Sequence, residues 1–191
     1  MGKGRLEAFS DGVIAIIITI MVLELRAPEG TSSDIIKPLI PKFISYVLSF
    51  LFVAIYWGNH HHLLHTVKRV NASIMWANMN LLFWLSLVPF VTGWMGENHF
   101  ERITVAVYAV LALFCGLSYT ILQKVIAKHY DEAMRDKVVE QKKWKSITAI
   151  ALYSIAIPVA LYVNPIISGF LFFAVSVIWL IPDSGIEKAL E

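Results

Sequence analysis

The chain alternates long apolar runs with short polar segments. A transmembrane helix needs about 20 mainly apolar residues, because the hydrocarbon layer is about 30 Å thick and a helix rises about 1.5 Å per residue. Segments rich in turn-forming residues, such as "RAPEGTSSD" and "MGENHFE", separate the runs. The pattern predicts an all-α integral membrane protein, one domain over residues 1–191, with six spans at 6–25, 42–64, 73–95, 103–127, 145–163 and 165–181.

Basic residues predict the orientation of these spans, since cytoplasmic loops carry an excess of lysine and arginine. With the N-terminus in the cytoplasm, 12 basic residues fall on cytoplasmic segments and four on outer ones. Six spans then place both termini in the cytoplasm. The segment "KHYDEAMRDKVVEQKKWK" between the fourth and fifth spans indicates a solvated helical extension, with a lipid or ligand site as the alternative. We expect a multi-pass protein of the plasma membrane, in contact with lipid.

The composition agrees with this assignment. The chain is 58% apolar and 16% charged, with a mean hydropathy of +0.67, which excludes an ordinary soluble domain. Its one cysteine, Cys115, excludes an intramolecular disulfide framework and a cysteine-based zinc site. The net charge of +2 says little about partners. We expect no nucleic-acid partner and no cofactor.

Polar side chains gather at the cytoplasmic ends of the first three spans. Since an ionisable group at membrane depth needs partners, we expect a network that joins the first three helices. Its expected members are Arg5, Ser10, Asp11, His60, His61, His62, His65, Asn78 and Asn80.

The histidines of "YWGNHHHLLHT" allow more than one interpretation. His61 and His65 are four residues apart and share a helical face, which is a spacing that can serve a metal. Hydrogen bonding between helices is the leading interpretation, and a metal site at His61 and His65 or a pH sensor are the alternatives.

The first span has two different sides. At about 100° per residue, Gly12, Thr19, Ile20 and Leu23 fall within about 60° of Ile16, whereas Ser10 and Asp11 point about 120° and 140° away. The polar end is thus directed into its own subunit, and the side that carries Ile16, Thr19, Ile20 and Leu23 faces a different neighbour. By pattern alone, that neighbour is lipid or another helix of the chain.

The residues resemble a known family. Arg5, Phe9, Ser10 and Asp11 match the R-x-x-x-F-S-D signature on the first helix of the transmembrane protein 175 family, the endosomal and lysosomal potassium channels and their bacterial relatives. The signature opens the first of six spans, the second span ends in a Trp and His cluster, and "NMNLLFWLSLVPFVT" in the third is also similar to the family. The resemblance covers essentially the whole chain.

The resemblance implies a passive, potassium-selective cation channel, a homotetramer with a pore lined by the first helix of each subunit. K⁺ would permeate, Na⁺ less well, without enzymatic activity or a T-V-G-Y-G filter. The bulky residue five positions after the motif aspartate, Ile16, would form the tightest constriction, with Ile20 and Leu23 continuing the pore lining. Thr19, eight positions after the aspartate, would contribute to selectivity. Glu24, Glu29 and Asp34 would gather cations at the outer mouth or be ordinary solvated acids.

Two other functions remain open on the residues alone. A proton- or metal-coupled transporter would use the histidine cluster at the end of the second span. A membrane enzyme would use zinc on His61 and His65, and it would need a third ligand and an acid or base at the same depth.

Overall fold

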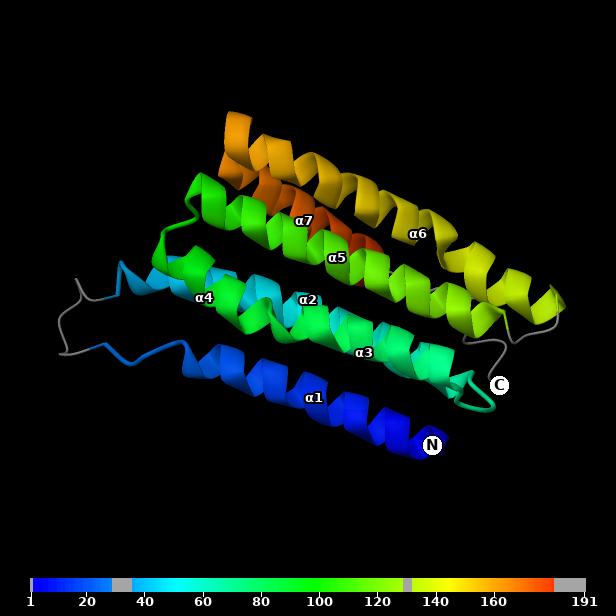
Figure 1. The fold of residues 1–191 in the computed structure, drawn as a ribbon. Helices are drawn as coiled ribbons and strands as arrows, with labels where there is room; N and C mark the ends of the chain where they lie inside the picture. Colours follow the sequence, from blue (N-terminus) through cyan, green and yellow to red (C-terminus); the bar gives the residue numbers. More distant parts are fainter. Residues whose placement is uncertain (1, 29–35, 129–131, 181–191) are drawn as a thin grey trace.

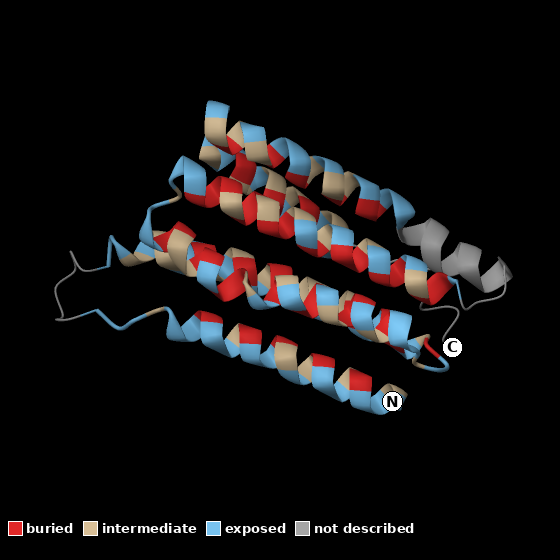
Figure 2. Cartoon of the chain, viewed as in Figure 1, coloured by how far each residue is buried: buried red, intermediate tan, exposed pale blue. Residues whose placement is uncertain are grey.

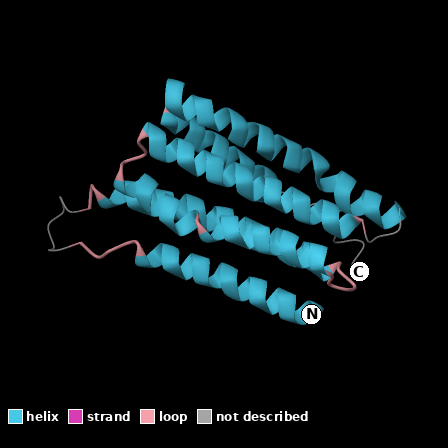
Figure 3. Cartoon of the chain, viewed as in Figure 1, coloured by secondary structure: helices cyan, strands magenta, loops and turns pink. Residues whose placement is uncertain are grey.

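The computed structural model describes residues 2–28, 36–128 and 132–180, without the side chains of residues 132–142. All regular elements of this part are helices (Figure 3). They are α1 (Lys3–Leu23), α2 (Leu39–His65), α3 (Ala72–Ser86), α4 (Val88–Glu97), α5 (Arg102–Ala127), α6 (Glu132–Pro158), a π-helical turn at Val159–Val163, and α7 (Pro165–Leu180). The segment between the fourth and fifth predicted spans is therefore helical from Glu132 onward.

The helices lie side by side along a common direction (Figure 1). Helix α1 forms one edge and packs against α2, α3 and α4, while α6 lies on the opposite side of α5. In the most apolar 18-residue window of α5, 56% of the residues are buried, compared with 28% for α1. Helix α5 is therefore central, and α1 is a peripheral helix with a large free face.

The helix lengths make this a multi-pass membrane protein. Five helical stretches are long and apolar enough to cross a bilayer: α1, α2, α3 with α4, α5, and residues Lys143–Val163. The sixth predicted span corresponds to α7, which has 16 residues and is shorter than the usual minimum of about 17. Residue 181, the last of that predicted span, lies outside the described residues. Six spans with both termini in the cytoplasm remain a prediction.

Prolines set the two interruptions inside the long spans. Pro89 has no N–H, and its ring would clash with the carbonyl of Leu85 in a continuous helix. Helix α3 accordingly ends at Ser86, and α4 begins at Val88 with Pro89 in its first turn. Pro158 ends α6, and the following turn closes with Asn164 N–H donating to the Val159 carbonyl, five residues back.

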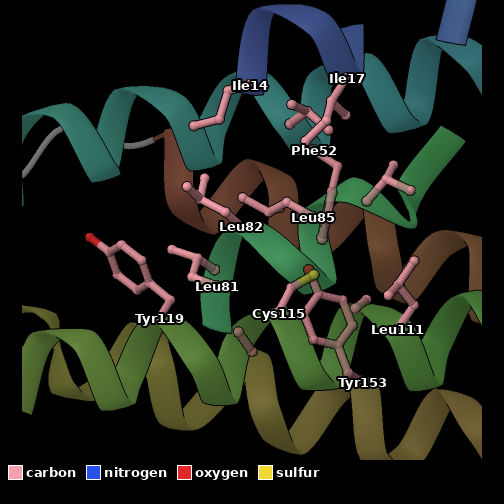
Figure 4. Close-up of a cluster of buried hydrophobic side chains, with 14 of the residues drawn as sticks. Ile14, Ile17, Phe52, Leu81, Leu82, Leu85, Leu111, Cys115, Tyr119 and Tyr153 are labelled. Carbon is pink, nitrogen blue, oxygen red and sulfur yellow. The ribbon is translucent and has the colours of Figure 1, made fainter. Parts of the chain in front are cut away.

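The apolar core joins α1 to the rest of the bundle. Ile14 and Ile17 from α1, Leu82 and Leu85 from α3, and Phe52 from α2 belong to the buried cluster seen in Figure 4. All five are at most 7% exposed. Each such side chain stabilises the fold through close packing as well as burial, because protein interiors are filled to crystal-like density.

Gly96 marks a close approach of α4 to α2. A Cβ atom at this position would overlap with Ser45 Oγ and lie 2.9 Å from Lys42 Cα. Because the second neighbour is backbone, a side chain here must push the helices apart. We expect Gly96→Ala to lower the free energy of unfolding by about 1–3 kcal/mol. Thermal denaturation in detergent measures this. Gly58→Ala on α2 is the control, since no atom lies within 4 Å of its added Cβ. An equal melting temperature for the two variants would contradict the close approach.

Candidate functional site

Helix α1 has one buried face and one exposed face (Figure 2). Its buried residues recur at intervals of three or four positions, which places them on one side of a helix, and they are Leu6, Ser10, Ile14, Ile17 and Met21. This face anchors α1 to its own bundle. The opposite face is therefore free to form a second surface.

The exposed face carries the stripe predicted from the sequence. Ile16, Ile20 and Leu23 are 58%, 41% and 75% exposed, although each is a large apolar side chain. Thr19 is also exposed, and Gly12 leaves open space beside the helix. The four side chains Ile16, Thr19, Ile20 and Leu23 are hereafter called the α1 stripe.

Thr19 is the polar member of the α1 stripe. Its hydroxyl donates a hydrogen bond of 2.8 Å to the carbonyl of Ile16, one turn earlier. The hydroxyl hydrogen is thus occupied, while the oxygen keeps lone pairs for an outside partner. The side chain therefore offers an acceptor on the exposed face, which suits a cation and not an anion.

A buried hydrogen-bonded chain joins the inner ends of the first three helices. His60 Nε2 of α2 lies 2.6 Å from Asn78 Oδ1 of α3, and Asn78 Nδ2 donates to Ser10 Oγ of α1 at 2.9 Å. Ser10 Oγ donates in turn to the Leu6 carbonyl at 2.8 Å. Because the serine hydrogen is used on Leu6, the Asn78 amide must donate to Ser10 and accept from His60. This fixes the His60 tautomer with the proton on Nε2.

Asp11 belongs to a second, separate contact. Its Oδ1 accepts a hydrogen bond of 3.0 Å from the indole N–H of Trp57 on α2. A carboxylate acceptor strengthens such a bond because the acceptor is charged. Together with the Ser10 chain, this contact sets both the depth and the rotation of α1 relative to α2.

Other expected members of the network are not brought into it. Asn80 Nδ2 donates to Ser118 Oγ on α5 at 2.8 Å, on a different side of α3 from Asn78. Arg5 and Phe9 are exposed, and the Arg5 side chain makes no hydrogen bond or ion pair within the described residues. His61, His62 and His65 are also exposed. The buried chain therefore includes Ser10, His60 and Asn78, three of the nine expected residues.

The exposed histidines lie close to one another on α2. The ring centre of His61 lies 5.9 Å from that of His62 and 6.4 Å from that of His65. No group of three or more His, Cys, Asp or Glu side chains that could hold a metal occurs in the described part of the chain. A metal site at His61 and His65 remains a prediction, and it would need a further ligand from elsewhere.

Lysine side chains tie helix ends together at both ends of the bundle. Lys3 Nζ donates to the carbonyl of His65 at 2.6 Å and lies 3.7 Å from Glu7. A cation at the C-terminal end of α2 is favourable because the last carbonyls carry partial negative charge. At the other end, Lys42 pairs with Glu97 at 3.2 Å, and Glu24 is exposed. Glu29 and Asp34 lie outside the described residues.

Sequence reasoning missed Trp57 and Ser118 as polar partners. Trp57 precedes the histidines by one turn, and a tryptophan near a span end is usual at a membrane interface. Ser118 is the one serine of the otherwise mainly apolar helix α5. The available signal for Trp57 was that an indole N–H near Asp11 at the same depth is a suitable donor for a carboxylate that needs a partner.

Comparisons with known proteins give a consistent result. The family model described as endosomal/lysosomal potassium channel TMEM175 matches residues 5–89. A potassium channel of Chryseobacterium sp. is 50% identical over 191 residues, which is 100% of this chain and 99% of the relative. A potassium channel of Chamaesiphon minutus is 32% identical over 149 residues, 73% of this chain and 70% of the relative. A crystal structure of a lysosomal potassium-selective channel TMEM175 homolog from Chamaesiphon minutus matches with a TM-score of 0.78 and 28% identity, over 93% of this chain and 95% of that one.

Proposed function

The chain belongs to the TMEM175 family of channels, and we propose that it forms a passive, potassium-selective cation channel with α1 as the pore-lining helix. Family membership confirms the prediction that the protein is not an enzyme, since the matched relatives are named channels. The finer features of the pore rest on the geometry of α1.

The observation that carries the proposal is the α1 stripe. Helix α1 is fixed by its buried face and by polar contacts at its inner end, yet Ile16 on the opposite face is 58% exposed. A homotetramer that turns this face toward a common axis would bring four copies of Ile16 together. Four apolar side chains around an axis exclude water when they are close and let a cation pass when they part. The stripe then forms a hydrophobic gate.

Thr19 supplies the polar part of the same pore. Its hydroxyl hydrogen is bonded to the Ile16 carbonyl, so four threonine oxygens would present lone pairs to the axis. Hydroxyl oxygens replace the hydration shell of potassium more readily than that of sodium, whose dehydration costs more. We therefore expect potassium selectivity without a rigid cage of carbonyl groups.

We propose that the protein lies in the plasma membrane and that the end of the bundle that contains His60, here called the His60 end, faces the cytoplasm. In the described residues, the helix ends and turns at this end carry Lys3, Arg5, Lys68, Arg69, Lys124 and Lys128, and those at the other end carry Arg26, Lys37, Lys42 and Arg102. This distribution favours a cytoplasmic His60 end. Helix α7 is proposed as the sixth span, short because its 16 residues rise only about 24 Å.

A coupled transporter gains no support from the described histidines. His60 is 1% exposed and bonded to Asn78, so it is a structural partner of α3. Recording currents across planar bilayers distinguishes the two functions. With purified protein and unequal KCl and NaCl solutions, we expect unitary currents that reverse near the potassium potential. Saturable flux that never exceeds carrier rates, or flux driven by a proton gradient alone, would contradict a channel.

Thr19→Ala tests the selectivity role. Removal of the four hydroxyl oxygens is expected to lower the ratio of potassium to sodium permeability about threefold, equivalent to about 0.6 kcal/mol. The ratio is measured from reversal potentials under bi-ionic conditions. Ser154→Ala on α6 is the matched control, because Ser154 is also exposed and its hydroxyl donates to a backbone carbonyl, that of Ile150. If the permeability ratio of Thr19→Ala equals that of the control, Thr19 has no part in selectivity.

A further inference from the structure

A pocket lies between four helices, away from α1. Its walls come from α2, α5, α6 and α7. The cavity volume is about 30 Å³, and all the empty space between the walls, including the part open to the outside of the chain, is about 440 Å³. All 12 lining residues are uncharged. At membrane depth, such a lining favours an uncharged ligand because a charge without a partner is costly there.

The walls of the pocket are largely aromatic. Tyr119 packs edge-on against both Tyr56 and Trp179, with ring centres 5.9 and 5.7 Å apart. Phe52 adds a tilted contact to Tyr56 at 4.8 Å and an edge contact to Tyr153 at 6.5 Å. Five aromatic rings therefore surround the space, and ligand pockets of this kind hold a ring by its faces and edges.

Two phenol groups at the pocket have unused hydrogen-bonding capacity. Tyr119 donates to the Asn59 carbonyl, and Ser176 donates to the Phe172 carbonyl. By contrast, the hydroxyls of Tyr56 and Tyr153 have no hydrogen-bond partner within the described part of the chain, although Tyr153 is only 3% exposed. Because neither hydroxyl is bonded within this part of the chain, both are available to a ligand that donates and accepts hydrogen bonds.

Gly116 contributes to the available space. A Cβ atom at this position would lie 3.8 Å from Tyr56 Oη and 3.8 Å from Ile150 Cγ1, which is ordinary van der Waals contact. Since Gly116 lines the pocket, a larger side chain here would extend into it without first displacing the backbone. The position therefore allows the pocket to be filled by a single substitution.

We propose that this pocket binds a small uncharged aromatic alcohol that enters from the bilayer. The ring packs among Phe52, Tyr119 and Trp179, and the hydroxyl bonds to the phenols of Tyr56 and Tyr153. Because the cavity itself is small and most of the space is open to the outside of the chain, a ligand with one ring suits the site better than one with several. The site uses no residue of the α1 stripe, and it does not depend on the proposed conduction.

Binding of 4-bromobenzyl alcohol tests the proposal. Titration calorimetry uses the full chain in lipid nanodiscs, with empty nanodiscs as the measure of partition into lipid. We expect saturable binding, and in crystals soaked with this compound an anomalous bromine peak between Gly116 and Trp179. Gly116→Leu is expected to abolish the saturable component. Gly169→Leu on α7 is the control and should retain it, because open space surrounds its added Cβ.

A second pair of variants keeps the test decisive if Gly116→Leu does not assemble. Tyr153→Phe removes one hydroxyl from the pocket and is expected to weaken binding about fivefold. Tyr162→Phe is its control, since Tyr162 is 81% exposed and outside the pocket. Equal affinity in Tyr153→Phe and Tyr162→Phe, saturable binding that survives in Gly116→Leu, or a phospholipid chain in the pocket in place of the bromine peak would each overturn the proposal.

Discussion

Replacing Ile16 by Asn is expected to raise the resting potassium conductance at least about tenfold, which corresponds to a barrier lowered by about 1.4 kcal/mol. In the proposed tetramer, the change places four amide groups where four apolar side chains meet. Amides form hydrogen bonds with water, so the constriction stays wet when the helices are close. Single-channel recording measures the open probability and unitary current, and potassium flux into liposomes measures the total leak.

The control for Ile16→Asn lies on the same helix. Val22 is 46% exposed and belongs to α1, but it lies about 120° from Ile16 around the helix axis. Val22→Asn therefore adds the same polar group away from the proposed pore. Both variants should elute from a sizing column like the original protein. A leak that is equal in the two variants, or a conductance insensitive to residue 16, would remove Ile16 from the gate.

Replacing Asn78 by Leu is expected to lower the free energy of unfolding by about 1–3 kcal/mol. The leucine fills most of the amide volume but leaves His60 Nε2–H without its acceptor and Ser10 Oγ without its donor. Both groups are buried at 1% exposure or less, so water cannot replace the missing partner. Thermal or denaturant unfolding in detergent measures the loss.

Asn80→Leu is the matched control for this stability prediction. The Asn80 amide makes one hydrogen bond to Ser118 on a side of α3 that is more exposed, so its loss should cost less than that of Asn78. The combined variant Ser10→Ala with Asn78→Leu should be less destabilised than the sum of the two, because both changes break the same hydrogen bond. Full additivity would show that Ser10 and Asn78 do not act as a pair.

The division of α1 into two faces was predictable because it is a local property. Helical geometry fixes the angle between Ser10 and Ile16 from their spacing alone, and the structure buries Ser10 and exposes Ile16. The depth at which Ser10, His60 and Asn78 meet followed from the same kind of reasoning. Each of the three residues lies close to the end of its span that was predicted to face the cytoplasm. Because neighbouring spans are antiparallel, these ends lie at a similar depth.

The partners of individual side chains were not predictable in this way. Two asparagines only two positions apart in α3 serve different neighbours, Asn78 joining α1 to α2 and Asn80 joining α3 to α5. Lys145, counted among solvated cytoplasmic charges, is 2% exposed, with its ammonium 5.8 Å from the ring centre of Trp144. Rotation and depth of neighbouring helices decide such contacts, and an apolar span permits many rotations.

By itself, the sequence determined the membrane-spanning character of the chain, its family, and which residues of α1 share a face. Apolar length settles the first feature and helical periodicity the third, because they depend on the bilayer and on one helix at a time, whereas the family was indicated by the resemblance of Arg5, Phe9, Ser10 and Asp11 to its signature. Only the tertiary structure decided that Trp57 binds Asp11, that α4 approaches α2 at Gly96, and that four helices enclose an aromatic pocket. These features depend on how side chains from different helices pack against one another, which no single segment specifies.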